Sequence, residues 1–411
     1  MSQLLPPIVI LAAGSNITTL ALARCFRGTG VPVIAVDTDG NATLLRRSRN
    51  IDRVVTFEHL IADTTEFIAH LCSLGSELSA EWNKHVLLFP TEDTGLRICA
   101  DHYAELTKQF TLLGDPEERD LNKFMDKGRF FESLPQESQY VPWTRFFASC
   151  DELEAAIETF PFPVVVKPSR KDIDMSFQRT LGTKLIVLES AADITSSFRE
   201  LYPPEGVVVQ ELIEHTEGQE VCWWGYRSRD GVITGMTARE LRKFPIQGGT
   251  ATFMRSEHIE VLHEYARDIL ETINFYGVCE MPFLPVQDTE QYKVLELNPR
   301  CWLQVGLLYT SGLNAPLMAY DEAMDTNLPV GHAVARERVT WMSPEYDLLR
   351  VFRCGRSGGM LRNLARWFQD LNWADDRAVW SCKEPGVLAA RFLSYPAKLW
   401  KNRAMIRRGG Q

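Results

Sequence analysis

Residues 277–300 read GVCEMPFLPVQDTEQYKVLELNPR, two apolar runs separated by the polar turn Gln287 to Gln291. The pattern predicts two strands joined by that turn. Glu296 and Asn298 stand two residues apart at the end of the second strand, so their side chains point to the same face. A carboxylate and an amide oxygen there suit Mg²⁺, which completes its octahedron with water and phosphate oxygens. Taken alone, the pattern also fits an ordinary surface strand end followed by a proline turn.

Upstream, residues 8 to 114 repeat a short apolar run followed by a longer amphipathic one. The apolar runs are Ile8 to Ala12, Val31 to Val36, Val54 to Phe57, Val86 to Phe89 and Phe110 to Leu113. This alternation predicts a parallel α/β domain. Open parallel sheets place ligands beyond the carboxyl ends of their strands, so the loops 14–16, 37–41 and 90–93 are expected to share one rim.

The rest of the chain has a different character. From about Asp115 the sequence is charged and helical, and strands then return among helices, which predicts an α+β region. Within it, the apolar period of Ser256 to Asn274 predicts a helix. From about Gly331 it is rich in arginine and tryptophan and reads mostly helical. We therefore expect three parts, residues 1–118, 119–330 and 331–411.

Composition narrows the function classes. Of 411 residues, 44 are Lys or Arg and 54 are Asp or Glu, so the net charge of −10 disfavours a nucleic-acid binder. The nine cysteines are scattered and form no Cys-x-x-Cys pair, which argues against a disulfide framework and a zinc site. No apolar run approaches the ~18 residues of a membrane span, and we expect no signal peptide. The chain is expected to be cytoplasmic.

Four motifs precede or fall within this decisive stretch. They are Asp126-Lys127 leading to Val141-Pro142-Trp143-Thr144, the run Phe162 to Pro168, the run Val208 to Ile213 followed by Gly218-Gln219-Glu220, and Gly277 to Phe283 with Glu296-Leu297-Asn298-Pro299-Arg300. In this order they resemble the ATP-grasp superfamily, in particular carboxylate–amine ligases related to D-aspartate ligase and the large chain of carbamoyl phosphate synthetase. The resemblance covers about residues 5–325. It implies an N-terminal pre-ATP-grasp α/β domain and a two-lobed ATP-grasp domain, with a mostly helical extension after them.

The resemblance implies ATP as a cofactor and assigns Lys127 and Lys167 to its phosphates. Lysine suits this role as a mobile point charge. Lys127 also fits a solvated helix face, whereas Lys167 follows a buried valine run, where an unpaired charge would be costly.

The hinge that holds adenine through its backbone corresponds to Gln210, Glu211, Leu212 and Ile213. For Glu211 a backbone contact is preferred to a catalytic role. Glu220 fits a ribose contact and a surface charge equally well.

Two arginines are candidates for the chemistry. Arg242, in the segment Thr237 to Thr252 with Gly248-Gly249, is assigned to the γ-phosphate or an acyl-phosphate intermediate, because cations beside glycines suit an anion-binding loop. The same segment also fits a basic surface hairpin. In the resembling enzymes an arginine placed like Arg300 faces the transferred phosphate and the substrate carboxylate.

The metal site departs from the family pattern. The family usually has an acid directly before the aromatic residue of the first metal strand, and here Pro282 precedes Phe283. Glu280 lies about 6.5 Å earlier on the same face and could replace that acid only if the strand slips or bulges. Glu296 and Asn298 are thus the expected Mg²⁺ ligands, with Mn²⁺ as an alternative metal and Glu280 as a doubtful third ligand.

We therefore expect an ATP-dependent ligase that joins a small carboxylate to an amine, such as amino acids or peptides, through an acyl phosphate. Pro282 leaves open a catalytically impaired scaffold that binds nucleotide. A nicotinamide-dependent oxidoreductase is disfavoured because Gly-x-Gly-x-x-Gly is absent near Gly14. A homodimer is left open.

Residues Pro385 to Gln411 contain six Lys or Arg and no acid, interleaved with large apolar side chains. This pattern fits an amphipathic helix on an anionic membrane surface, which would place the enzyme at the inner face of the membrane. The alternative is that the apolar face packs on the ligase core. Pro396 is expected to interrupt any single long helix.

Overall fold

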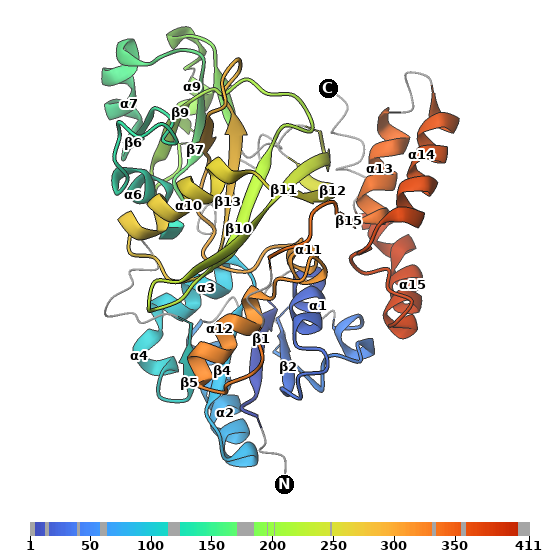
Figure 1. Ribbon diagram of the computed structural model, residues 1–411. Helices are drawn as coiled ribbons and strands as arrows, with labels where there is room; N and C mark the ends of the chain where they lie inside the picture. Colours follow the sequence, from blue (N-terminus) through green and yellow to red (C-terminus); the bar gives the residue numbers. More distant parts are fainter. Residues whose placement is uncertain are drawn as a thin grey trace.

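A computed structural model describes residues 5–12, 16–38, 42–57, 64–113, 124–170, 185–194, 196–200, 202–246, 249–330, 334–354 and 359–401. Predictions about positions 13–15, 39–41, 171–184, 247–248 and 402–411 lie outside these residues. The described residues form three sheets with helices around them (Figure 1).

Sheet A, in the N-terminal part, is parallel as predicted, with strand order β3-β2-β1-β4-β5. Its strands are β1 (Ile8–Ala12), β2 (Val33–Asp37), β3 (Arg53–Thr56), β4 (Val86–Pro90) and β5 (Phe110–Leu112), and its helices are α1 (Asn16–Cys25), α2 (Thr64–Trp82), α3 (Asp93–Asp101) and α4 (Tyr103–Leu106). Alternate residues of β1 join different hydrophobic clusters, Ile8 and Ile10 on one face and Val9 and Leu11 on the other. Burial on both faces explains why this strand is apolar throughout.

Sheet B is a four-stranded antiparallel sheet, in the order β6-β9-β7-β8, in the upper part of Figure 1. Its strands are β6 (Thr144–Phe147), β7 (Val164–Pro168), β8 (Ile186–Leu188) and β9 (Val207–Glu211), with helices α6 (Lys127–Glu132), α7 (Cys150–Ala156) and α9 (Ser196–Glu200) nearby. Ser149 caps α7, its hydroxyl accepting the Glu152 N–H at 3.2 Å. Alternate valines of β7 and β9 pack with Phe147, Phe160 and Phe198; they are Val164, Val166, Val207 and Val209.

Sheet C is antiparallel, in the order β14-β13-β10-β11-β12-β15. Its strands are β10 (Val221–Arg227), β11 (Ile233–Phe244), β12 (Thr250–Glu257), β13 (Gly277–Pro285), β14 (Tyr292–Val294) and β15 (Thr340–Met342). Helix α10 (Glu260–Thr272) packs an apolar stripe on one face, with Leu262, Ala266 and Ile269 buried. The helix was expected from Ser256, but Ser256 and Glu257 instead complete β12.

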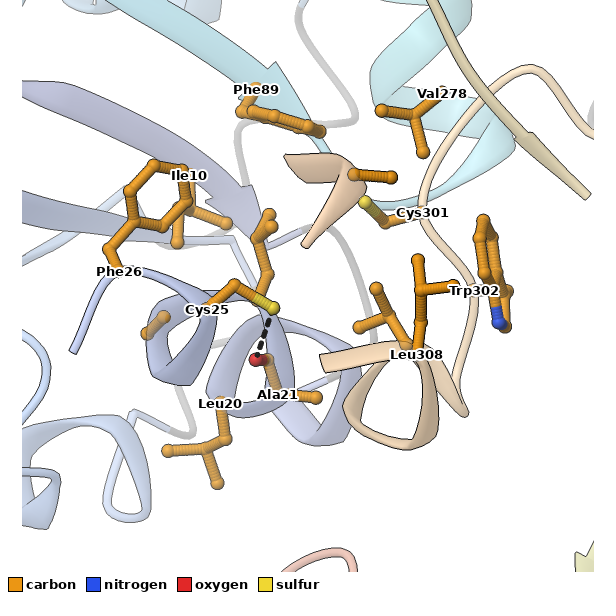
Figure 2. Packing of buried hydrophobic residues seen from close by; sticks show 14 of the residues in the cluster. Ile10, Leu20, Ala21, Cys25, Phe26, Phe89, Val278, Cys301, Trp302 and Leu308 are labelled. Atoms are coloured by element: carbon orange, nitrogen blue, oxygen red, sulfur yellow. Dashed lines mark hydrogen bonds between the residues drawn. The ribbon is translucent and has the colours of Figure 1, made fainter. Parts of the chain in front are cut away.

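Sheet A and sheet C share one hydrophobic cluster, to which α11 (Val305–Thr310) and α12 (Ala315–Met324) belong. Figure 2 shows Cys25 between Phe26 and Ile10 on one side and Cys301 and Leu308 on the other, with the Cys25 thiol donating to the carbonyl of Ala21 at 3.4 Å. Residues far apart in sequence thus form a continuous core, and the carboxyl rim of sheet A lies against the chain that follows β14.

The C-terminal extension is mostly helical, as expected. It contains α13 (Pro344–Cys354), α14 (Met360–Trp373) and α15 (Pro385–Lys401), at the right of Figure 1. The extension also supplies β15, which pairs with Phe253, Met254 and Arg255 of β12. The expected interruption at Pro396 is wrong, because α15 continues through it; a proline removes one helical hydrogen bond without ending this helix.

Buried ion pairs anchor the extension. Glu384 accepts hydrogen bonds from Arg24 Nε at 2.7 Å and Ser48 Oγ at 2.5 Å, which ties the start of α15 to the N-terminal part. Further along α15, Arg391 forms a bidentate pair with Glu345 of α13, with Nε 2.6 and 2.8 Å from its two carboxylate oxygens. One of the six cations expected to face a membrane is therefore buried inside the protein.

A buried carboxylate predicts a pH effect on stability. Burial raises the pKa of Asp376 to about 6, although Arg24 opposes the shift. The folded protein then binds a proton that the unfolded chain has already released, so this group lowers the free energy of unfolding as pH rises through about 4 to 6. Between pH 4.5 and 7 this effect should lower the free energy of unfolding of the unsubstituted protein by about 2 kcal/mol. We expect that decrease to be absent in Asp376→Asn, as measured by urea unfolding of both proteins. Parallel pH profiles for the two proteins would contradict this prediction.

Candidate functional site

The two predicted phosphate lysines lie on neighbouring elements. Lys127 begins α6, where Asp126 caps the helix by accepting the Arg129 N–H at 3.0 Å. The Lys127 backbone N–H donates to Ser169, two residues beyond Lys167, at 3.2 Å. The Lys127 ammonium lies 3.2 Å from a carboxylate oxygen of Glu296, which follows β14. The first and last motifs of the sequence thus meet in space.

Lys167 ends the buried part of β7, and its ammonium donates to the side-chain oxygen of Gln210 at 3.0 Å. Gln210 is 1% exposed and also donates to the Thr144 hydroxyl at 3.1 Å. Gln210 therefore positions Lys167 through its side chain and lies next to the hinge rather than lining it.

The hinge after β9 is held by protein contacts. A carboxylate oxygen of Glu211 accepts the Trp143 N–H at 3.1 Å, so this side chain supports the hinge. The Leu212 N–H donates to the carbonyl of Pro163 at 3.1 Å. Among the described residues, the N–H of Ile213 donates to no protein acceptor, which leaves it available to an adenine edge.

Glu220, at the start of β10, belongs to a buried charge cluster. Lys243 donates to Glu220 at 3.1 Å and lies 3.1 Å from Glu240. Burial and the charge of Glu220 raise the pKa of Glu240 to about 8, against the opposite influence of Lys243. One lysine thus faces two carboxylates. The sequence did not single out Glu240, because a glutamate among the cations Arg239, Arg242 and Lys243 reads as a solvated surface charge.

Arg242, on the same strand, lies among side chains of the C-terminal extension. Its guanidinium makes a bidentate pair with Asp347 at 2.9 Å, contacts Asp370 at 2.6 Å, and lies over the Phe253 ring. These partners raise the pKa of Arg242 despite burial, so the side chain stays charged. The phosphate role of Arg242 stays a prediction that would require it to leave both carboxylates. The described residues on either side of positions 247–248 belong to β11 and β12, which pair antiparallel.

The expected metal ligands converge. The side-chain amide of Asn298 lies 3.1 Å from a Glu296 oxygen and 3.2 Å from a Glu280 oxygen. Trp224 donates to the other oxygen of Glu280 at 3.0 Å. The described residues contain no cluster of three or more His, Cys, Asp or Glu that could hold a metal, so this site combines two carboxylates with an amide.

The pairing of β13 with the chain after β14 contains the register shift that Glu280 needs to lie beside the other expected metal ligands. Phe283 pairs with Val294, but Glu280 pairs with Asn298, so three steps along one strand match four along the other. In an unshifted register Glu280 would face Leu297. Pro282 accepts a hydrogen bond from the Leu295 N–H at 2.9 Å and has no N–H to return one. The ladder is therefore interrupted at Pro282, and Glu280 shares a face with Asn298.

Arg300 links this site to the rim of sheet A. Its guanidinium donates to Asp93 at 2.5 Å and to the Cys301 carbonyl at 3.1 Å. Burial alone would lower the pKa of Arg300, but Asp93 raises it, so the side chain stays charged. Asp93, at the start of α3, lies in the rim loop expected from the sequence, and with Lys127 and Glu296 it lines a small recess.

The fold has known counterparts, although no family model matches the chain and no curated protein matches it in sequence. N5-carboxyaminoimidazole ribonucleotide synthetase in complex with ADP superposes with a TM-score of 0.61 at 19% identity, over 86% of this chain and 87% of that chain. The biotin carboxylase domain of 2-oxoglutarate carboxylase from Hydrogenobacter thermophilus, a dimer with MgADP and bicarbonate, gives 0.61 at 12% identity, over 82% and 74%.

Phosphoribosylglycinamide synthetase from Anaerococcus prevotii gives a TM-score of 0.55 at 16% identity, over 82% of this chain and 79% of that chain. In all three comparisons the match includes most of both chains, so it extends over the parallel domain and the two antiparallel sheets. The chain has the ATP-grasp fold, preceded by a parallel α/β domain and followed by a helical extension.

Proposed function

We propose that the protein is an ATP-dependent carboxylate–amine ligase. The observation that carries the proposal is the 3.2 Å pair between Lys127, at the start of α6, and Glu296, which follows β14. It brings the expected phosphate-binding cation to the expected metal-binding carboxylate, and a metal–triphosphate complex needs both groups within reach. Two of the similar folds were solved with ADP, which supports a nucleotide site in this fold.

In this proposal the nucleotide lies between sheets B and C. The Ile213 N–H binds the adenine edge, Glu220 contacts the ribose, and Lys127 and Lys167 neutralise phosphate charge. Glu211 acts through the backbone of Trp143, which fixes the hinge.

The residues around Asn298 fit Mg²⁺. If the side-chain amide of Asn298 is flipped so that its oxygen points inward, all the side-chain ligands are oxygen atoms. Glu296, Asn298 and Glu280 would hold the ion, and Mn²⁺ would be accepted by the same oxygens. When bound, the ion would neutralise charge on the phosphate oxygens. The short distances of Asn298 to both carboxylates support all three as ligands.

The reaction follows from these positions. A substrate carboxylate oxygen attacks the γ-phosphorus of ATP, ADP leaves, and an acyl phosphate forms. An amine then attacks the acyl carbon, phosphate leaves, and the nitrogen loses a proton. Arg300 orients the carboxylate, and Asp93 holds the guanidinium charged and fixed. No nucleophilic side chain is needed.

The test measures ADP release with MgATP and pairs of candidate amino acids, with mass spectrometry of products. ADP formation that needs both a carboxylate and an amine supports the ligase. Thermal stabilisation by MgATP without turnover for any pair would instead support the nucleotide-binding scaffold. Stabilisation by NAD or NADP alone would point to the oxidoreductase.

One prediction concerns Glu280. We expect Glu280→Gln to raise the Mg²⁺ concentration for half-maximal activity about tenfold, because one charged ligand becomes neutral. The control is Glu260→Gln, an exposed carboxylate at the start of α10. Mn²⁺ binding to the ATP complex, followed by electron paramagnetic resonance, gives a second readout. An unchanged metal requirement would make Glu280 a structural partner of Trp224.

Peripheral membrane contact through α15 receives no support from the described residues, because Arg391 is buried against Glu345. No helix of the described part is long and apolar enough to cross a membrane. A homodimer stays a proposal, for which the dimeric form of one similar fold is the motivation. Both are open to measurement, by vesicle co-sedimentation and by light scattering.

A further inference from the structure

A second cavity, of about 850 Å³, lies at the end of sheet C away from the candidate site. Strand β10 begins after Glu220, in the candidate site, and its other end, at Tyr226, lines the cavity. The first residues of β11 and part of α12 form its other walls. None of the residues assigned above to nucleotide or metal lines this cavity.

One wall is an open strand edge. Strand β11 begins at Ile233, whereas its pairing with β12 begins only where Thr237 faces Glu257. On the other side, β11 forms its backbone hydrogen bonds to β10 through even-numbered residues. At the two ends of this ladder, the Glu240 N–H donates to the Glu220 carbonyl and the Ser228 N–H to the Val232 carbonyl, each at 2.9 Å.

The backbone groups of Ile233 and Gly235 must therefore point away from β10, toward the cavity. Within the described part of the chain no backbone group pairs with them. The structure thus leaves donors and acceptors in the spacing of a strand ladder, inside a cavity rather than on an open surface.

The remaining walls combine apolar and acidic side chains. Leu313, Met318 and Val330 are apolar. Among the lining residues that the structure describes, Asp230, Asp321, Glu322 and Glu337 are acidic, and Arg336 is the only lysine or arginine. Burial lowers the pKa of His263, so this histidine adds no compensating charge near neutral pH. The cavity favours a cationic ligand with apolar side chains.

We propose that this cavity binds an extended peptide with alternating basic and apolar side chains, added to β11 in line with β12. The peptide backbone would pair with Ile233 and Gly235, while its cations would meet the acidic wall. This site is separate from the proposed ligase centre and does not depend on it.

The test uses a fluorescein-labelled hexapeptide of alternating lysine and valine, with blocked ends, and fluorescence anisotropy with the full chain. Two N-methylated forms carry the methyl groups on alternate amides. We expect only one of these forms to bind about tenfold more weakly, because a strand uses alternate N–H groups on each edge. We expect glutamate in place of lysine to abolish binding, and added salt to weaken it.

A matched pair of variants tests the edge itself. Ile233→Pro removes an N–H that faces the cavity and none that pairs with β10, and proline is tolerated at the first residue of a strand. We expect about fivefold weaker binding than for Ile233→Ala, which keeps the N–H. Glu337→Lys should weaken binding at low salt.

Three results would overturn the proposal. They are no binding of the basic peptide, equal binding of the acidic peptide, and equal effects of the two methylation patterns. Full competition by spermidine, a cation without a peptide backbone, would show that charge alone explains binding and would also overturn strand addition.

Discussion

Replacement of Lys167 by alanine is expected to lower ATP-dependent turnover about 100- to 1,000-fold, the effect of removing one well-placed charge-stabilising group. Lys167 ends a buried strand and donates to the Gln210 side chain, so the ammonium is already positioned before nucleotide binds. Because alanine leaves the valines of β7 in place, the folded state should persist. Initial rates of ADP release at saturating MgATP measure the effect.

The matched control is Lys293→Ala. Lys293 lies on β14 in the opposite lobe, and its ammonium donates to the Val141 carbonyl at 2.9 Å. We expect this variant to keep its rate within about threefold, because Lys293 supports backbone and has no assigned phosphate contact. Equal losses in both variants would mean that Lys167 acts only through the fold.

Replacement of Glu345 by alanine is expected to lower the free energy of unfolding by about 3–5 kcal/mol, since it leaves the Arg391 charge buried without a partner. The side chains are 6% and 5% exposed, and Trp380 also donates to Glu345 at 3.0 Å. Urea unfolding followed by tryptophan fluorescence measures the loss.

The control is an exposed pair of the same chemistry. Arg53 contacts Glu77 at 2.8 Å with 42% and 55% of the two side chains exposed, and Arg53→Ala should cost less than about 1 kcal/mol. The double variant Glu345→Leu with Arg391→Met should recover most of the loss, because no lone charge remains. Similar losses for the single and the double variant would show that packing, rather than charge burial, sets the cost.

Strand positions could be predicted where the chain is buried on both faces. The apolar runs that contain β1, β2 and β4 can be recognised as strands from the sequence, since a central parallel strand has no polar face. Helix α10 follows from its apolar period, but its start at Glu260 did not, because Ser256 and Glu257 fit a helix start and a strand end equally well.

The candidate site was predictable only in part. Lys127, Glu296 and Asn298 belong to local motifs, and the fold brings them together. The register shift that turns Glu280 toward Asn298 was required by the sequence argument but not predicted by it. Its cause, the missing N–H of Pro282, acts on a strand whose partner can be read only from the structure.

Long-range pairing was beyond sequence reasoning. Arg242 looked like a phosphate ligand because Lys243 and glycines surround it, whereas its carboxylate partners are 105 and 128 residues away. Local charge patterns carry no information on which acids a fold will bring to a given arginine. The same holds for Arg391, which reads as a membrane-facing cation and is paired inside the protein.

Strand β15 has a consequence for how the protein is made. Synthesis runs from the N-terminus, so β12 is complete long before Thr340 to Met342 emerge to pair with it. Until then the outer edge of β12, at Phe253 to Arg255, offers unpaired backbone to any other nascent chain. Chains that stop before β15 should therefore accumulate as aggregates rather than as a smaller folded protein, and chaperones that shield strand edges should matter most during this interval.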